Sequence, residues 1–114
     1  MKDKTYSLTV DAMLQLIHES EEQASISREL ILESLADREK DRRTVPLCEC
    51  FSLNSKIVQI LDFALRNGEI GFGEDEEEQI IFSSKDMIML ETLVLARYYM
   101  TLDLSSMNIS TYFH

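Results

Sequence analysis

The chain has 114 residues and carries 21 Asp and Glu against 11 Lys and Arg, a formal net charge of −10. That length fits one domain, so we expect residues 1–114 to form a single domain. The charge disfavours nucleic acid and anionic membranes as partners, because both are negative and the sequence has no basic stripe. The apolar content of 45% is typical of a folded chain rather than a disordered one.

The first 43 residues read as a short extended lead-in over 1–8 followed by helix. Apolar residues recur at i, i+3, i+4 and i+7 in Val10, Met13, Leu14 and Ile17. Thr9 is expected to cap this helix. No apolar residue lies within 18–23, so we expect a break there and a second helix over about 25–43. A single long helix is the alternative, because the segment holds no Gly or Pro.

The middle of the chain is expected to form a connection over 44–53 and then a third helix. The proline in the connection pushes the preceding residue toward extended geometry. Asn54 or the residue after it is the expected cap of the helix. Asn67 and Gly68 are typical of a helix end, with the glycine in the left-handed conformation.

Residues 69–82 alternate in the manner of a β-hairpin. Ile70 and Phe72 alternate on one arm, and Ile80 and Phe82 alternate on the other. The residues between the arms, 73–78, are acidic and hold no apolar side chain that could order them by burial.

The last helix is expected to begin at Ser83 or Ser84 and to reach about Leu102. It is apolar nearly all round, so it lies in the centre of the core or one face meets another chain. The alternative to a core position is a homodimer seam, formed by Met87, Tyr98, Tyr99 and Met100. The tail from residue 103 keeps apolar residues and is expected to dock on the body.

Together these elements predict an α+β, mostly helical fold. It has about four helices, with one β-hairpin before the last, largely apolar helix. The predicted core consists of Leu14, Ile17, Leu30, Leu61, Leu65, Phe72, Ile81, Ile88, Leu95 and Tyr99.

Catalytic and metal-binding patterns are not evident in the sequence. Cys48 and Cys50 form a C-x-C pair, and the sequence has no second cysteine pair. Zinc sites usually combine two ligand pairs, with the two cysteines of a pair separated by two to four residues. His18 and Glu22 share a helical face, but a zinc protease needs a second His at the later position. We therefore predict no catalytic residue, metal or cofactor, and not an enzyme. Two cysteines and no secretory signal predict a cytoplasmic protein.

Two acidic runs are the candidate partner-binding residues. The first is the run in the hairpin loop: Glu74, Asp75, Glu76, Glu77 and Glu78. The second lies on the first helix: Glu19, Glu21 and Glu22. Like charges held together repel one another, and a basic partner would relieve that repulsion.

The composition therefore predicts a small acidic protein that binds and neutralises a basic protein partner. The leading hypothesis is an inhibitor of the immunity-protein or antitoxin kind, which occludes the active site of a nuclease toxin. One alternative is a dimeric chaperone or adaptor for a secreted or regulatory protein. Another is a phage-type mimic of nucleic acid that blocks a nucleic-acid-binding protein.

Overall fold

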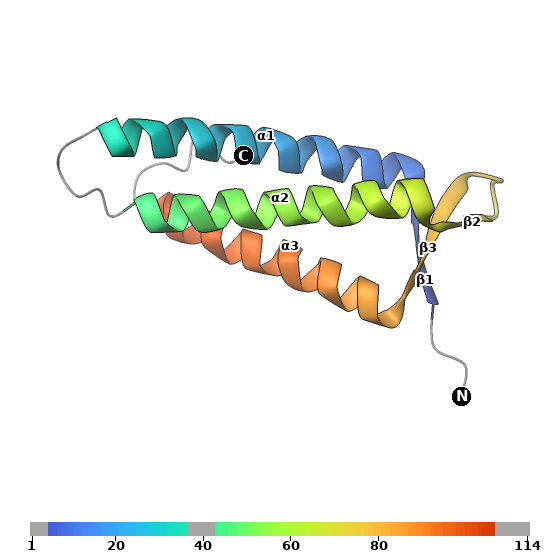
Figure 1. Cartoon of the computed structure of the whole chain (residues 1–114). Coiled ribbons are helices and arrows are strands. Elements are labelled where there is room, and N and C mark those ends of the chain that lie inside the picture. The colour runs from blue at the N-terminus through green and yellow to red at the C-terminus, as the bar shows by residue number, and fades with distance from the viewer. Residues whose placement is uncertain (1–4, 37–42, 107–114) are drawn as a thin grey trace.

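The structure, a computed structural model, describes residues 5–36 and 43–106. Long helices lie side by side, and a small antiparallel sheet closes one end of them (Figure 1). The elements in chain order are β1 (Thr5–Thr9), α1 (Val10–Ala36), α2 (Thr44–Asn67), β2 (Glu69–Phe72), β3 (Glu78–Ser83) and α3 (Ser84–Leu104). The mostly helical α+β class is confirmed, but the described residues form three helices and not four.

The molecule is elongated, with principal-axis extents of 54 × 27 × 22 Å and a radius of gyration of 16.6 Å. A compact domain of this length would have a radius of gyration of about 13 Å. The difference arises because the helices run along one axis. An elongated bundle has more surface for its mass, so it leaves more apolar side chains in contact with water.

α1 is one continuous helix over Val10–Ala36, so the expected break over 18–23 was wrong and the long-helix alternative is confirmed for these residues. The rest of the predicted helix, residues 37–42, lies outside the described part of the chain. The buried stripe continues through that segment with a small polar residue, Ser20, which is fully buried. Met13, Ser20, Ser27 and Ser34 recur every seven residues and are all buried. Small side chains at this spacing let α1 pack closely on α2 without an unbroken apolar pattern.

α2 begins ten residues earlier than expected, so residues 44–53 are helix and not a connection. Pro46 lies in the first turn, where its missing N–H has no intrahelical partner to lose. Asn54 is a buried residue of the helix interior and not a cap. The predicted end at Asn67 is confirmed, but Gly68 has φ −74° and is not left-handed. Glycine is needed there for space, because a Cβ would lie 2.4 Å from the Ala64 carbonyl oxygen.

The hairpin is confirmed, and the lead-in adds a third strand to it. The strand order is β1-β3-β2, with both pairs antiparallel. Ile70 pairs with Ile80 across the hairpin, and Tyr6 pairs with Phe82 on the other side of β3. Ile80 and Phe82 are buried, while Ile81 between them is half-buried. β3 is therefore the central strand, and its alternate side chains carry the sheet's contribution to the core.

The core has two apolar parts along the bundle. We call the larger the sheet-end cluster: Met13, Ile57, Leu61, Ile80, Phe82, Met87 and Leu90. The smaller, the far-end cluster, contains Leu30, Leu47, Cys50 and Leu104. Each helix supplies both clusters, so the two ends of the bundle are held by the same three helices.

Half of the predicted core lies at the surface. Five of the predicted core residues reach the interior. Leu30 and Leu61 are buried, and Ile17, Leu65 and Ile81 are half-buried. The expectation was wrong for Leu14, Phe72, Ile88, Leu95 and Tyr99, which are exposed. On α1 and α3 the residue one position earlier, Met13 or Met87, is buried instead of Leu14 or Ile88. Helices that are apolar on several sides do not show by spacing alone which side faces inward.

Helix starts at the sheet end follow the predicted caps. The Thr9 hydroxyl accepts a hydrogen bond of 3.1 Å from the Ala12 N–H, and the Ser83 hydroxyl accepts one of 3.2 Å from the Asp86 N–H. Each satisfies a backbone donor that the helix leaves unpaired. α3 extends two residues beyond the expected end, and its last residue, Leu104, is fully buried. Residues 107–114 lie outside the described part of the chain.

Candidate functional site

The acidic turn between β2 and β3 is ordered by one of its own carboxylates. Glu77 Oε2 accepts a hydrogen bond of 3.1 Å from the Asp75 N–H, and Glu77 Oε1 accepts one of 3.0 Å from the Gln79 side chain. Backbone bonds of 3.0 Å join Gly73 with Glu76 and Glu77. Glu77 is half-buried, whereas its acidic neighbours Glu74, Asp75, Glu76 and Glu78 are exposed. Burial of apolar groups does not order this turn, as expected, but hydrogen bonds do.

The second predicted run lies on α1, roughly 14–18 Å along the helix from its start at about 1.5 Å per residue. Glu19, Glu21 and Glu22 are all exposed. Glu19 forms an ion pair with Arg97, with Oε1 3.1 Å from the guanidinium nitrogen. Glu21 and Glu22 are in no ion pair among those that the structure shows for the described residues.

Further carboxylates, which sequence reasoning did not single out, share this surface. Asp11, Glu29 and Glu33 are exposed on α1 and lie on the same outward side of the helix as Glu22. Successive members of the series Asp11, Glu22, Glu29 and Glu33 are 11, 7 and 4 residues apart, each close to a whole number of helical turns. This spacing could have identified them from the sequence. At the start of α1, Asp11 and the turn residues Glu77 and Glu78 line one shallow hollow. The turn and α1 therefore form one surface.

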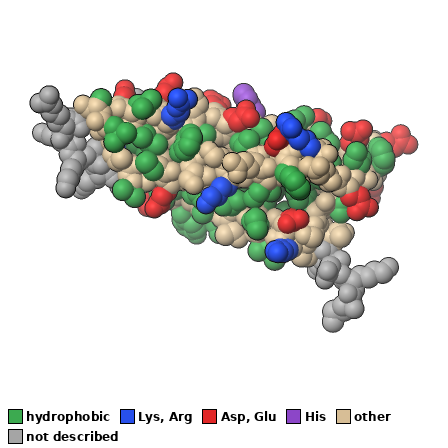
Figure 2. Space-filling model, viewed as in Figure 1, with side chains coloured by type: hydrophobic (Ala, Val, Ile, Leu, Met, Phe, Trp, Pro, Cys, Tyr) green, Lys and Arg blue, Asp and Glu red, His purple; other side chains and the backbone are tan. Residues whose placement is uncertain are grey.

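We call this surface the acidic edge. It consists of Asp11, Glu19, Glu21, Glu22, Glu29 and Glu33 on α1, with Glu74, Asp75, Glu76, Glu77 and Glu78 in and beside the turn. Arg28 is the one Lys or Arg of α1. α2 carries two acidic and two basic residues, and α3 carries three acidic and two basic residues. In Figure 2 acidic side chains gather along the α1 side and at the turn end of the molecule. The negative charge is thus concentrated on one side.

A buried guanidinium lies at mid-height in the bundle. Arg97 on α3 donates hydrogen bonds of 2.9 Å to the Ser20 hydroxyl and 3.2 Å to Asn54 Oδ1. We call Ser20, Asn54 and Arg97 the polar layer. It joins all three helices and separates the two apolar clusters. Ser20 and Asn54 are both buried, while the third partner of Arg97, Glu19, is exposed at the rim of the bundle. Because the two buried partners need this donor, the layer fixes which turn of each helix faces the others.

The thiol of Cys50 lies beside this layer. Asn54 donates a hydrogen bond of 2.9 Å to the Cys50 carbonyl oxygen and lies 3.4 Å from its sulfur. Burial raises the pKa of the Cys50 thiol above its ordinary value of 9.0, and hydrogen bonding to Ser27 and the charge of Arg97 oppose that rise. A thiol with a raised pKa is a weak nucleophile at neutral pH. Cys48, by contrast, is exposed, and both are free.

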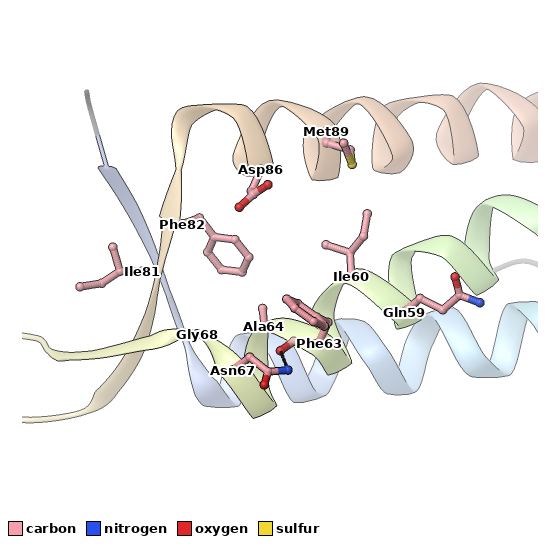
Figure 3. A pocket seen from close by; sticks show the side chains of 10 residues that line it. All are labelled: Gln59, Ile60, Phe63, Ala64, Asn67, Gly68, Ile81, Phe82, Asp86 and Met89. Atoms are coloured by element: carbon pink, nitrogen blue, oxygen red, sulfur yellow. Dashed lines mark hydrogen bonds between the residues drawn. The ribbon is translucent and has the colours of Figure 1, made fainter. Parts of the chain in front are cut away.

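A pocket of about 420 Å³ opens between α2, β3 and the first turns of α3. In Figure 3 the Phe82 ring lies between the two helices, and Ile60 and Met89 point toward each other across the space. The walls are mostly apolar, with Ile60, Phe63, Ala64, Phe82 and Met89, while Gln59, Asn67 and Asp86 add polar groups. Such walls suit an apolar side chain or a small apolar molecule.

Among residues 5–36 and 43–106, no three His, Cys, Asp or Glu side chains converge in a way that could hold a metal ion. The described helices include none with the length and apolar character needed to cross a membrane.

Compared with known protein families, curated proteins and solved structures, the chain matches none of them.

Proposed function

We propose that this protein binds a basic protein partner through the acidic edge and inhibits it by occlusion. The immunity-protein or antitoxin class fits best, with a nuclease toxin as the target. The observation that carries this proposal is the segregation of charge, because eleven carboxylates lie on α1 and the adjoining turn. A nuclease holds phosphates with Lys and Arg, so an inhibitor that presents carboxylates matches its active site.

Electrostatics makes this surface a good recognition element. Charges on it act over about 8–10 Å at physiological salt, so neighbouring carboxylates reinforce one another. A concentrated field of one sign raises association rates with an oppositely charged partner. α1 spans roughly 40 Å at 1.5 Å per residue, which is long enough to cross the cleft of a small enzyme.

The backbone at Glu76 supports a role for the turn. Its φ is 59°, the only positive value at a non-glycine residue in the described chain. A glutamate in this conformation costs about 1 kcal/mol relative to glycine, which has no Cβ to clash. A glutamate in this conformation, where glycine would carry no such cost, supports a role for its charge at the tip of the turn.

The experiment is affinity purification of the tagged chain from its native host at about 100 mM salt, with mass spectrometry of the bound proteins. We expect a stoichiometric basic protein that is released by raising the salt to about 0.5 M. An enzyme assay of that partner then tests inhibition. Recovery of the chain without any basic protein would count against the proposal.

A matched pair of variants localises the binding surface. The first neutralises four exposed carboxylates of the turn: Glu74→Gln, Asp75→Asn, Glu76→Gln and Glu78→Gln. Glu77 is left intact because it orders the turn. The control neutralises four exposed carboxylates elsewhere: Glu49→Gln, Asp62→Asn, Glu69→Gln and Asp103→Asn. Both lose four negative charges, so only a specific surface distinguishes them.

We expect the turn variant to bind the basic partner at least about tenfold more weakly, which is the scale of one or two charge contacts. The control should keep its affinity. Equal weakening in both variants would show that total charge and not the acidic edge attracts the partner. The same design on α1, Glu21→Gln with Glu22→Gln, tests the second predicted run. Glu19 is left out of it because it pairs with Arg97.

A chaperone or adaptor is the second candidate, and the pocket favours it. An extended partner could place an apolar side chain between Phe82 and Met89, with weak dependence on salt. A nucleic-acid mimic would share the salt dependence of the inhibitor and differ only in its target. We place the chain in the cytoplasm on the basis of its two free cysteines, which suit a reducing compartment.

A further inference from the structure

The outward side of α3 is an unusual surface for a protein of charge −10. We call it the outer stripe: Ile88, Glu91, Thr92, Leu95, Tyr98, Tyr99 and Leu102, all exposed. Its five large apolar residues are 48–61% exposed. Glu91 is the one charged residue in the stripe. Depletion of charge together with exposed tyrosines and leucines is the composition of an interface centre.

The spacing within the outer stripe is symmetric about Leu95. Ile88 lies seven residues before it and Leu102 seven residues after. Glu91 and Tyr99 lie four residues before and after, and Thr92 and Tyr98 lie three before and after. Two antiparallel copies of the helix that cross at Leu95 would therefore bring each residue against its counterpart.

We propose that the outer stripe is the interface of an antiparallel, two-fold symmetric homodimer of this chain. Leu95 lies at the two-fold axis and meets its own copy, and Ile88 meets Leu102 of the second copy. Tyr99 faces the second copy's Glu91, so the phenolic O–H donates to the one carboxylate of the stripe. This arrangement satisfies the charge that would otherwise oppose burial of the surface.

The size of the stripe fits such a dimer. At roughly 200 Å² per large residue, the five apolar side chains leave about 600 Å² exposed. A stable interface removes about 800 Å² from each partner. Glu91 and Thr92, which are also exposed, supply further area. The seam predicted from the sequence named Met87 and Met100, but Met87 is in the sheet-end cluster and Met100 packs against the far-end cluster.

The distribution of charge favours the same pairing. α1 and α3 lie on opposite sides of α2 in Figure 1. Dimerisation through the outer stripe therefore leaves the α1 part of each acidic edge turned away from the other protomer. Repulsion between the two copies is screened rather than strengthened by salt, so the dimer differs from the basic-partner complex in its response to salt.

The molar mass of the full chain is the first test, measured by light scattering because an elongated chain elutes early from a sizing column. We expect twice the chain mass of 13.2 kDa, retained at about 0.5 M salt. Leu95→Glu brings two carboxylates together at the axis and should weaken the dimer about 100-fold or more. Leu32→Glu is the matched control, since Leu32 is 58% exposed on α1 and Leu95 is 54% exposed.

Disulfide trapping tests the direction of the two helices. In a Cys48→Ser background, which removes the exposed native thiol, Leu95→Cys should cross-link to itself under mild oxidation. Ile88→Cys and Leu102→Cys should cross-link only when the two variants are mixed. Self-linking of Ile88→Cys would indicate parallel helices and overturn the antiparallel arrangement.

A chain mass of 13.2 kDa at every concentration, or equal loss of the dimer in both glutamate variants, would overturn the proposal. Retained far-UV circular dichroism in Leu95→Glu shows that its loss of mass is not unfolding. Because the outer stripe and the acidic edge are separate surfaces, failure of the dimer leaves the proposed binding of a basic partner untouched.

Discussion

The sheet-end cluster and the polar layer are neighbouring parts of one bundle with opposite chemistry. The sheet-end cluster packs apolar side chains from three helices and β3. The polar layer, halfway along, holds a buried guanidinium between Ser20 and Asn54. Burial of apolar surface stabilises folded chains strongly, whereas a buried charge with hydrogen-bonded partners contributes little net stability. The sheet-end cluster therefore supplies stability, and the polar layer supplies the register of the three helices against one another. The following substitutions separate these two roles.

Truncation in the sheet-end cluster should have the largest effect. Leu61 is fully buried, so Leu61→Ala leaves a cavity and should lower the free energy of unfolding by about 3 kcal/mol. Chemical denaturation followed by circular dichroism measures it. Leu32→Ala, at an exposed site of α1, is the control and should change stability by less than about 0.5 kcal/mol. Similar losses in both would mean that the cluster is not the stabilising part.

Breaking the polar layer from one side should cost less. Arg97→Met leaves the Ser20 hydroxyl and Asn54 Oδ1 buried without their donor, at an expected cost of about 2 kcal/mol. Replacing all three residues, with Ser20→Ala and Asn54→Leu added, should recover most of that loss, because no polar group then remains unpaired. If the triple variant is less stable than Arg97→Met, the layer contributes stability of its own.

The caps at the sheet end should have a smaller effect. Ser83→Ala removes the acceptor for the Asp86 N–H and should cost about 1 kcal/mol. Ser52→Ala, at an exposed site within α2, is the control and should be neutral or slightly stabilising. The start of α2, at the other end of the bundle, has no such side-chain cap. An unchanged unfolding free energy in Ser83→Ala would remove this difference between the two ends.

Alkaline pH should give the smallest effect, at the boundary between the polar layer and the far-end cluster. The pKa of Cys50 is raised in the folded state, so the folded thiol stays protonated when the unfolded thiol ionises. The contribution of this thiol to the free energy of unfolding is fully present below the ordinary pKa of 9.0. It is lost as the pH rises through the pKa of the folded state. When the pH is raised from below to above the ordinary pKa of 9.0, the free energy of unfolding should fall less in Cys50→Ala than in Cys48→Ala.

Local signals in the sequence were sufficient for the helix starts at Thr9 and Ser83, the end at Asn67 and the hairpin. Each depends on residues within a few positions of one another. The continuity of α1 was not predictable in this way. Ser20 is acceptable in the core because Arg97, 77 residues later, donates to it. The start of α2 was missed because a proline in a first turn resembles a proline in a loop.

For the candidate site, composition located the acidic turn and the run on α1 but not their connection. Contact between the turn and the start of α1 arises because β1 pairs with β3. The inward role of Glu77 depends on the backbone of the turn, which five consecutive acidic residues do not reveal. Ile88, Leu95 and Tyr99 of the outer stripe were predicted as core, with a dimer seam as the alternative for the helix, because spacing alone does not distinguish an inward apolar face from an outward one.

The position of β3 between β1 and β2 also bears on how the chain folds during synthesis. Thr5 pairs with Ser83, so the first strand has no partner until most of the chain has been made. α1 and α2, adjacent in sequence, can associate well before that. We therefore expect closure of the sheet to be a late step with high contact order, and the slowest part of folding. A nascent chain that stops before residue 78 would keep a helical hairpin with an unpaired amino-terminal strand.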